Sequence, residues 1–267
     1  MEQAKLSVIT INYNNAEGLE RTIGSVLCQS YRPIEYIIID GGSKDASVDI
    51  IQKNKDKITK WISEADAGVY NAMNKGIRMS SGEYLIFLNS GDLFRDQDTL
   101  QDFMQDCGNE DILYGDVIMR GETGERIKTH PATLSFEFFL YDNLCHQCTL
   151  IRRALFETVG LYDEKIKIVS DWAFFVNAIC RFNASYKHVP IPISVFYLGG
   201  LSSSPENEGL IQREKATFLS DHYEAFLQDY KRLDEYRSAL NLVRLSRLHR
   251  VANMISGSRF YKFIVGK

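Results

Sequence analysis

The sequence predicts an α/β fold in which a doubly wound, mostly parallel sheet precedes a C-terminal helical extension. Short β-branched apolar runs alternate with segments of helical spacing, and these runs end in polar or glycine-rich residues. The chain after residue 205 again has helical spacing. Strands that alternate with helices are typical of parallel sheets that carry helices on their faces.

The alternation is clearest in the first 92 residues. β-branched runs such as the one around Ile38 suit short buried strands. Strands are expected over residues 6–11, 34–40, 60–63 and 83–88, and helices over 16–30, 45–51 and 68–79. Asp45 is a candidate cap for the second of these helices.

The second half is more mixed, and no Pro/Gly/Ser-rich linker separates it from the first. Strands are expected near 112–119 and 186–189, and helices near 171–181 and 206–230. We expect a domain over 1–205, divided into a nucleotide-sugar-binding half (1–92) and an acceptor half (93–205). A helical region with a basic amphipathic tail is expected over 206–267.

Composition excludes several classes of protein. With 45% hydrophobic and 25% charged residues among 267, the chain is neither disordered nor a disulfide scaffold. A net charge of −4 argues against a nucleic-acid-binding protein. Five cysteines and no secretory leader predict a reduced, cytoplasmic protein. No apolar run approaches the ~20 residues that span a bilayer.

The C-terminal tail is basic. No acidic residue follows Glu235, and seven positive charges lie beyond it, which leaves −11 on the remainder of a chain whose total is −4. These charges are on Arg237, Arg244, Arg247, Arg250, Arg259, Lys262 and Lys267. A basic amphipathic helix can lie on an anionic membrane surface, and it can equally dock on the protein with its charged face in water. The sequence leaves both interpretations open.

Polar residues follow four of the expected strands. They are Asn12 with Tyr13, then Asp40, the segment 64–66 and the segment 89–92. In open parallel sheets ligands bind beyond the carboxyl ends of the strands, so one crevice is expected to collect these groups.

Two of these carboxylates have a binding and a structural interpretation. Asp40, followed by two glycines, can accept hydrogen bonds from a base or a ribose hydroxyl, or can simply form a turn. Asp66 has the same two possibilities and is also a candidate helix cap.

Asp92 follows an apolar strand. A lone carboxylate there can ligate a divalent cation whose other ligands are water and phosphate oxygens. The alternative is a cap for a helix beginning near Phe94 or Gln97.

Asp171 precedes an aromatic-rich helix. Apolar neighbours are expected to raise the pKa of its carboxyl, which suits a general base, and the alternative is an ordinary helix cap. His146 can orient an acceptor hydroxyl or be a core histidine. Cys145 and Cys148 lack a second pair for zinc.

No phosphate-binding P-loop, dinucleotide fingerprint, nucleophile elbow or zincin motif is present. Taken in order, however, the motifs resemble those of inverting family 2 glycosyltransferases with the GT-A fold, in the bacterial branch that assembles capsule, O-antigen or exopolysaccharide units. The matching segments are SVITINYN (7–14), IIDGGSKD (38–45), EADAGVYNAMNKG (64–76), SGEY (81–84), LNSGD (88–92), HQ (146–147), SDW (170–172) and GGLS (199–202).

This resemblance implies a metal-dependent enzyme that transfers a sugar from a nucleotide-diphosphate sugar, with a UDP-sugar favoured, to a glycan or polyprenyl-linked acceptor. It implies nucleotide contacts at Thr10, Tyr13, Asp40 and Asp66, Mg²⁺ or Mn²⁺ at Asp92, a base at Asp171, and acceptor contacts at His146, Gln147 and Trp172. Peripheral contact with the inner face of the cell membrane through the basic tail is also expected.

Asn89 and Gly91 replace acids that are common in the metal motif of the family, which leaves one strong ligand. That departure motivates an alternative, a non-catalytic nucleotide-sugar-binding scaffold subunit. A nucleotidyltransferase is disfavoured because residues 12–18 lack a basic glycine-rich loop.

Overall fold

The computed structural model describes residues 4–121 and 124–245, with side chains through residue 243. The chain divides into two compact units, residues 1–214 and residues 215–267. We describe each unit separately.

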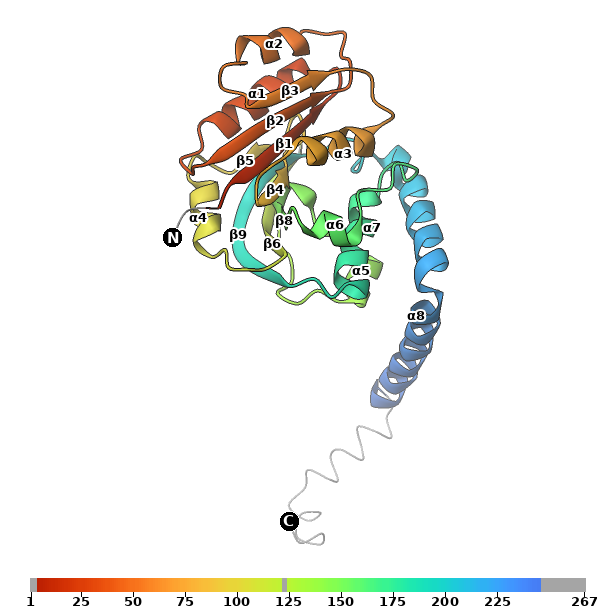
Figure 1. The fold of residues 1–267 in the computed structure, drawn as a ribbon. Helices are drawn as coiled ribbons and strands as arrows, with labels where there is room; N and C mark the ends of the chain where they lie inside the picture. Colours follow the sequence, from red (N-terminus) through yellow and green to blue (C-terminus); the bar gives the residue numbers. More distant parts are fainter. Residues whose placement is uncertain (1–3, 122–123, 246–267) are drawn as a thin grey trace, which may run out of the picture. The chain divides into compact units, whose positions relative to one another are not determined.

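In the described part of the first unit, nine strands form one mixed sheet in the order β3-β2-β1-β4-β8-β6-β9-β5, with β7 paired to β6 (Figure 1). The strands are β1 (Leu6–Asn12), β2 (Ile34–Asp40), β3 (Lys60–Ser63), β4 (Tyr84–Phe87), β5 (Leu93–Phe94), β6 (Ile112–Gly121), β7 (Gly124–Lys128), β8 (Thr149–Arg152) and β9 (Tyr186–Tyr197). The expected α/β architecture is confirmed.

The four strands of the N-terminal half are mutually parallel. Their register pairs Asn12 with Asp40, and Asp40 with Ser63. The last residues of β1, β2 and β3 therefore lie side by side at one edge of the sheet, as the sequence predicts.

Helices cover both faces of this parallel half. The helices α1 (Ala16–Leu27) and α2 (Ser47–Lys53) share a hydrophobic core with alternate residues of β1 and β2, including Val8 and Ile38. On the other face, Gly76 of α3 (Val69–Met79) lies so close to Ile9 that an added Cβ would be 2.5 Å from the Ile9 Cγ2 atom. Alternating strand residues thus serve two helical layers.

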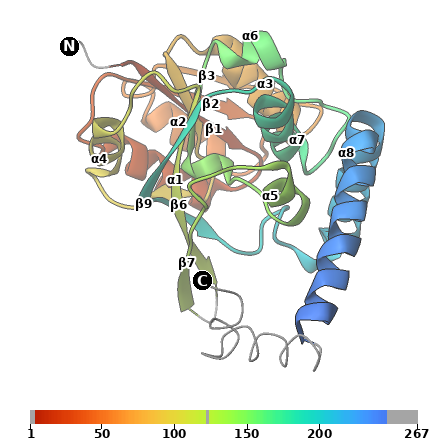
Figure 2. The same ribbon diagram turned by 90° about the horizontal axis from the view of Figure 1, so that it is seen from below.

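Several short elements of the second half are absent from the sequence prediction. They are β5, β7, β8, α4 (Thr99–Gln105), α5 (Phe136–Tyr141), the 3₁₀ turn η1 (His146–Cys148) and α6 (Leu155–Val159). The expected helix at 171–181 is α7 (Ser170–Val176), which continues into a π-helical turn, Asn177–Arg181. In two views at right angles, α3, α6 and α7 lie on the same side of the sheet (Figures 1 and 2).

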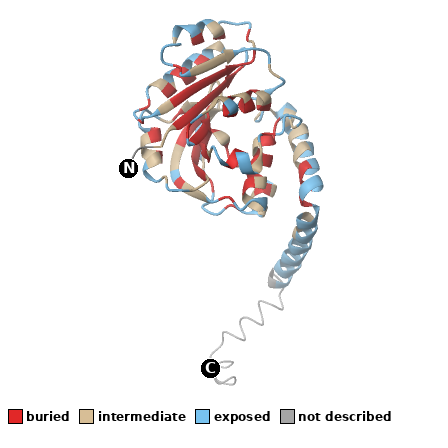
Figure 3. Ribbon diagram, viewed as in Figure 1, coloured by how far each residue is buried: buried red, intermediate tan, exposed pale blue. Residues whose placement is uncertain are grey.

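Buried residues concentrate in the central strands (Figure 3). Every residue of β1 and β4 is buried, because strands in the middle of a sheet with helices on its faces contact apolar side chains on both sides. Asp45 does not cap α2: the N-cap residue is Ala46, and Asp45 instead accepts hydrogen bonds from the backbone of Ser47 and Ala16.

The described part of the second unit is helical. Its helical segment α8 (Glu208–Leu245) begins in the first unit and is kinked at Tyr223, whose backbone is not helical (φ −135°, ψ 23°). Most of its side chains from residue 224 onward are exposed. Most of the basic tail, residues 246–267, lies outside the described residues. Within residues 4–121 and 124–245, no helix is both long and apolar enough to cross a bilayer.

A buried carboxylate connects the strands at the end of the sheet opposite to Asp40. Glu35 accepts hydrogen bonds from Ser7 Oγ (2.6 Å) and from Ser81 N (2.7 Å) and Oγ (2.8 Å). Lys60 forms an ion pair with it at 3.0 Å. Burial alone would raise the pKa of Glu35, but these donors outweigh burial and lower it to about 2.

We expect Glu35→Gln to lower the free energy of unfolding by about 3 kcal/mol at pH 7, because a folded-state pKa about 2.5 units below the unfolded value of 4.5 adds that much stability. This contribution is fully present above pH 4.5 and is lost as the pH falls towards 2. Urea unfolding at pH 7 and pH 3 should show the gap to wild type shrink to less than half, and an unchanged gap would contradict the assignment. The exposed Glu20→Gln is the control and should stay within about 0.5 kcal/mol.

Candidate active site

Asp40 organises the carboxyl edge of the parallel strands. Its Oδ1 accepts from Asn12 Nδ2 (2.8 Å) and Ser43 Oγ (2.6 Å), and its Oδ2 accepts from Ser43 N (3.0 Å) and Ser63 Oγ (2.7 Å). Burial would raise the pKa of Asp40, but these four bonds outweigh it and lower the pKa. Both oxygens of Asp40 accept hydrogen bonds within the protein, and two of these bonds hold the turn at Ser43.

Asp66 and Tyr13 lie against the glycine that follows Asp40. A Cβ added to Gly41 would be 2.5 Å from Asp66 Oδ2 and 3.3 Å from the Tyr13 ring. Tyr13 is 66% exposed and Asp66 is half-buried. Asp66 does not cap α3, whose N-cap residue is Gly68, although its Oδ1 accepts from Gly68 N (3.0 Å). The Asp66 carboxylate and the Tyr13 ring therefore both lie next to Gly41, at the carboxyl edge of the parallel strands.

Thr10 does not join this group. It is fully buried in β1, and its hydroxyl donates to Leu88 O at 2.8 Å. The side chain is engaged inside the sheet rather than at its edge.

Asp92 lies in a tight turn in which its own N–H donates to Asn89 O (2.8 Å). Its side chain is buried, and no side chain within the described part of the chain donates a hydrogen bond to its carboxylate. Burial raises the pKa of Asp92 to about 7, with the Cys145 charge adding to the rise and the His146 charge opposing it. The expected alternative of a cap fails, because α4 begins at Thr99 after its N-cap residue Asp98.

His146 and Asp171 form a hydrogen-bonded pair. His146 Nδ1 donates to Asp171 Oδ2 at 2.9 Å, and the Tyr70 hydroxyl lies 2.8 Å from Asp171 Oδ1. On its other side, His146 Nε2 lies 3.1 Å from the amide nitrogen of Asn89. A chain of polar contacts thus runs from the turn that contains Asp92 to Tyr70 in α3.

The direction of the Asp171 shift differs from the one expected from the sequence. Burial does oppose its ionisation, but the hydrogen bond and charge of His146 and the Tyr70 hydroxyl outweigh burial and lower the pKa of Asp171. For His146, burial is likewise outweighed by Asp171, and the pKa of the imidazole is raised. Asp171 is also not the helix cap, which is Val169. An apolar neighbourhood in the sequence did not reveal these two polar partners.

Gln147 and Trp172 are buried beside these groups. The Trp172 indole N–H donates to Phe139 O at 3.0 Å, which ties α7 to α5. The Trp172 side chain is therefore buried in the contact between α7 and α5.

The polar groups of the two halves are linked at the edge. Asn15 Nδ2 donates to Ser90 O (3.1 Å) and Ser90 Oγ donates to Asn15 O (3.2 Å), which joins the loop after β1 to the turn of Asp92. Asn89 of that turn then contacts His146. Contacts at this one edge thus connect the β1 loop, the Asp92 turn and Asp171.

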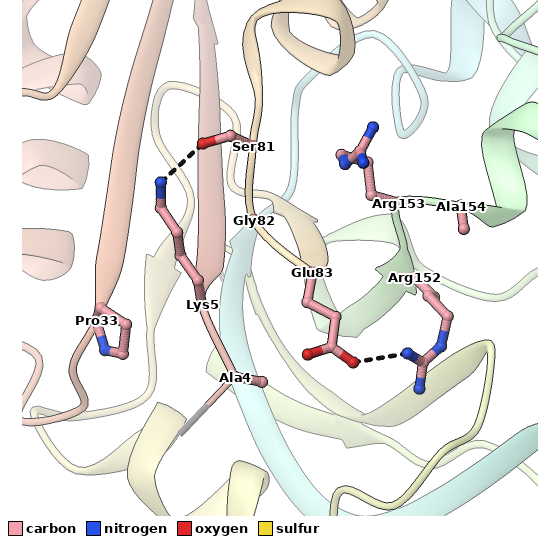
Figure 4. A pocket seen from close by; sticks show the side chains of 9 residues that line it. All are labelled: Ala4, Lys5, Pro33, Ser81, Gly82, Glu83, Arg152, Arg153 and Ala154. Carbon is pink, nitrogen blue, oxygen red and sulfur yellow. Dashed lines mark hydrogen bonds and ion pairs between the residues drawn. The ribbon is translucent and has the colours of Figure 1, made fainter. Parts of the chain in front are cut away.

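A separate pocket of about 570 Å³ lies at the opposite, amino end of β1 and β4. Figure 4 shows that three of its charged side chains contact neighbours in the pocket: Lys5 donates to Ser81, and Arg152 contacts Glu83. Because the strand ends that carry Asp40 and Asn12 lie at the other edge, this pocket is not part of the candidate site.

Two residues that contribute to the site were missed in the sequence. Tyr70 contacts a carboxylate 101 residues away, and Asn89 was noted only as a missing acid. Helical periodicity gave no indication of either contact, because both join segments from different halves.

Residues 7–160 match the family described as "Glycosyl transferase family 2". A PGL/p-HBAD biosynthesis glycosyltransferase of Mycobacterium tuberculosis is 31% identical over 224 residues, which cover 80% of this chain and 85% of the relative. An uncharacterized glycosyltransferase of Rickettsia typhi is 30% identical over 180 residues, covering 62% of this chain and 56% of that protein.

Solved structures show the same fold. TarS 1–349 of S. aureus in complex with UDP-GlcNAc has a TM-score of 0.62 at 20% identity, covering 80% of this chain and 66% of that one. This chain spans 37% of a longer TarS structure. A mannosyltransferase from Pyrobaculum calidifontis in complex with GDP-Man and Mn²⁺ has a TM-score of 0.59 at 14% identity, covering 85% and 65%. The fold is therefore of the GT-A type, and the chain belongs to glycosyl transferase family 2.

Proposed function

We propose that this protein is an inverting glycosyltransferase that moves a sugar from a nucleotide-diphosphate sugar to a hydroxyl of a glycan or lipid-linked saccharide in surface polysaccharide biosynthesis. The observation that carries the proposal is the ionised Asp171, held by His146 and Tyr70 and connected through Asn89 to the turn of Asp92. A carboxylate that is ionised at neutral pH is ready to accept a proton.

On the donor side, Tyr13 and Asp66 are the side chains that would contact the nucleotide. The exposed Tyr13 ring offers a stacking surface, and Asp66 offers an acceptor for ribose or base donors. Asp40 would act indirectly by fixing the loop at Gly41. The UDP-GlcNAc bound in the TarS structure supports a UDP-sugar as the donor class.

In the proposed reaction, Asp171 removes the proton of an acceptor hydroxyl while that oxygen attacks the anomeric carbon. The bond from the anomeric carbon to the diphosphate breaks on the opposite face, so a single displacement inverts the configuration. His146 would hold Asp171 and orient the acceptor, while Gln147 and Trp172 would shape the wall behind it. The hydrogen bond from His146 keeps the base oriented before the proton arrives.

A divalent cation, Mg²⁺ or Mn²⁺, fits the residues around Asp92. The carboxylate is buried without a side-chain donor, and Asn89 Oδ1, from the same turn, is buried without a partner among the described residues. When bound, the cation would neutralise charge that develops on the departing diphosphate. The Mn²⁺ in the mannosyltransferase structure supports this choice of metal.

The alternative is a non-catalytic nucleotide-sugar-binding scaffold subunit on the same fold. The observation that favours it is that, among the described residues, no group of three or more His, Cys, Asp or Glu side chains is arranged to hold a metal ion. A scaffold would bind the donor without turning it over, so turnover discriminates between the two.

We expect a UDP-sugar with Mn²⁺ to raise the melting temperature more than GDP, dTDP or CMP sugars do, because a ligand that binds the native state stabilises it. UDP release should follow in the presence of a hydroxyl acceptor. Asp171→Asn should lower the transfer rate by about 10²–10⁴-fold and leave the donor-induced melting shift in place. The exposed Asp56→Asn is the matched control. Equal turnover in Asp171→Asn would contradict the role of base, and donor binding with no turnover in wild type would favour the scaffold.

We expect Asp92→Asn to stabilise the metal-free protein by about 1–3 kcal/mol at pH 8, because it removes a buried charge that has no side-chain donor. The same change should abolish the rise in melting temperature that Mn²⁺ causes in wild type. Thermal unfolding with and without Mn²⁺ measures both effects. A variant that keeps the full Mn²⁺ response would rule out Asp92 as the metal ligand.

The acceptor is proposed to be a polyprenyl-linked sugar at the inner face of the cell membrane, reached through the basic tail. Replacing Arg244, Arg247 and Arg250 with glutamine should reduce sedimentation with anionic liposomes several-fold, since each basic residue near such a surface contributes about 1 kcal/mol. The control is the same change at the exposed Lys53, Lys55 and Lys57. Equal loss in both variants, or loss in neither, would argue against this contact.

A further inference from the structure

We propose that Tyr70 is the positioning residue of the base, holding Asp171 in place both before and after it takes up a proton. This inference rests on the proposed function, in which Asp171 is the base. Tyr70 lies in the first turn of α3, directly after the loop that contains Asp66.

Tyr70 is buried, and its hydroxyl has two acceptors. The oxygen lies 2.8 Å from Asp171 Oδ1 and 2.5 Å from the carbonyl oxygen of Ile168. A phenol has a single proton to donate, so both bonds cannot be made at full strength at once. The arrangement therefore offers the proton two alternative positions a short rotation apart.

These two positions match the two protonation states of Asp171. While Asp171 is a carboxylate, the Tyr70 proton points to Oδ1 and stabilises the negative charge. When the acceptor hydroxyl gives its proton to Asp171, the carboxylic acid can donate to the Tyr70 oxygen, and the Tyr70 proton turns to Ile168 O. No proton is gained or lost by Tyr70, and the hydrogen bond that holds the base reverses without breaking the contact.

The helix that carries Tyr70 is firmly docked on the segment that leads to Asp171. Asn74 donates to Tyr162 O (2.9 Å) and accepts from Tyr162 N (3.1 Å). Both Asn71 and Asn74 donate to the Glu164 carboxylate, each at 2.8 Å. The distance between Tyr70 and Asp171 is therefore set by contacts that do not involve Asp171 itself.

Each group that faces Asp171 has a defined origin. Tyr70 comes from α3, His146 from η1, and the Tyr162 ring from the loop after α6, where it packs 5.5 Å from the Tyr70 ring. The Tyr162 hydroxyl is buried and has no hydrogen-bond partner in the described structure. Of the neighbouring Tyr70 and Tyr162, only Tyr70 has a hydroxyl that contacts Asp171.

The test compares Tyr70→Phe with the matched control Tyr162→Phe, each of which removes one buried hydroxyl and keeps the ring. With UDP-GlcNAc and Mn²⁺ as the probe, UDP release by Tyr70→Phe should show kcat reduced about tenfold or more and KM for the donor changed less than twofold, because a base that loses an anchor is misplaced while the donor contacts remain. The acid limb of its kcat–pH profile should move to higher pH, since a lost donor raises the pKa of a carboxylate. Tyr162→Phe, which removes a hydroxyl that has no hydrogen-bond partner, should change each of the three much less than Tyr70→Phe does.

A second measurement does not need turnover. Because the Tyr70 bond favours ionised Asp171, the charge-dependent part of its contribution to stability is present above the unfolded pKa of Asp and is lost as the pH falls below it. Tyr70→Phe should melt below Tyr162→Phe at pH 7, and the gap should narrow at pH 3 without closing, because the contact with Ile168 O remains.

The outcomes separate the two proposals. Turnover in wild type with unchanged kcat and pH profile in Tyr70→Phe would overturn the role of Tyr70 and leave the transferase intact. Identical melting of both variants at both pH values would also overturn it. If wild type released no nucleoside diphosphate from any nucleotide sugar, the proposed function would be overturned. A pH-dependent difference in melting temperature between the two variants would still support Tyr70 as the group that holds Asp171.

Discussion

The burial of ionised carboxylates is the constraint on which the sheet and the candidate site both depend. An unpaired buried charge costs several kcal/mol, so each such group must find donors from elsewhere in the fold. The donors to Glu35 come from β1 and from the turn before β4. The donors to Asp40 come from β1, from β3 and from the turn that follows β2. These bonds tie neighbouring strands at opposite ends of the sheet. The hydrogen bonds that stabilise the buried Asp40 carboxylate therefore also hold the loop that contains Gly41.

Asp92 is the exception to this rule. Its carboxylate is as deeply buried as the others but receives no hydrogen bond from a described side chain, and its pKa rises where those of Glu35 and Asp40 fall. The backbone of Asn89 and the charge of His146 favour the ionised form of Asp92 but do not outweigh burial, and sites with such perturbed carboxyl groups are often functional. The contrast with Asp171, which is compensated by His146 and Tyr70, separates a group suited to a cation from a group suited to a proton.

The two halves of the first unit meet through α3. This helix starts beside the loop of Asp66 and carries Tyr70 to Asp171, so one helix connects these two carboxylates. Its polar face contacts residues 162–171, while Gly76 allows its other face to approach Ile9 closely. Because α3 packs on the sheet with one face and on the second half with the other, its non-covalent contacts fix how the sheet and the second half are placed.

The sequence alone determined the alternation of strands and helices in the first 92 residues, because periodicity follows from local spacing. It also predicted that polar groups gather at one sheet edge, because parallel strands have their carboxyl ends at the same edge. It missed β5, β7 and β8, because these short strands, unlike the equally short β3 and β4, lie outside the regular strand–helix alternation of the first 92 residues. It named Asp171 but expected the pKa of its carboxyl to be raised, whereas the fold lowers it. The family resemblance implied a nucleotide contact at Thr10, whose side chain the fold buries. Only the tertiary structure decided these points, because the burial of a side chain and its hydrogen-bond partners depend on segments up to a hundred residues away.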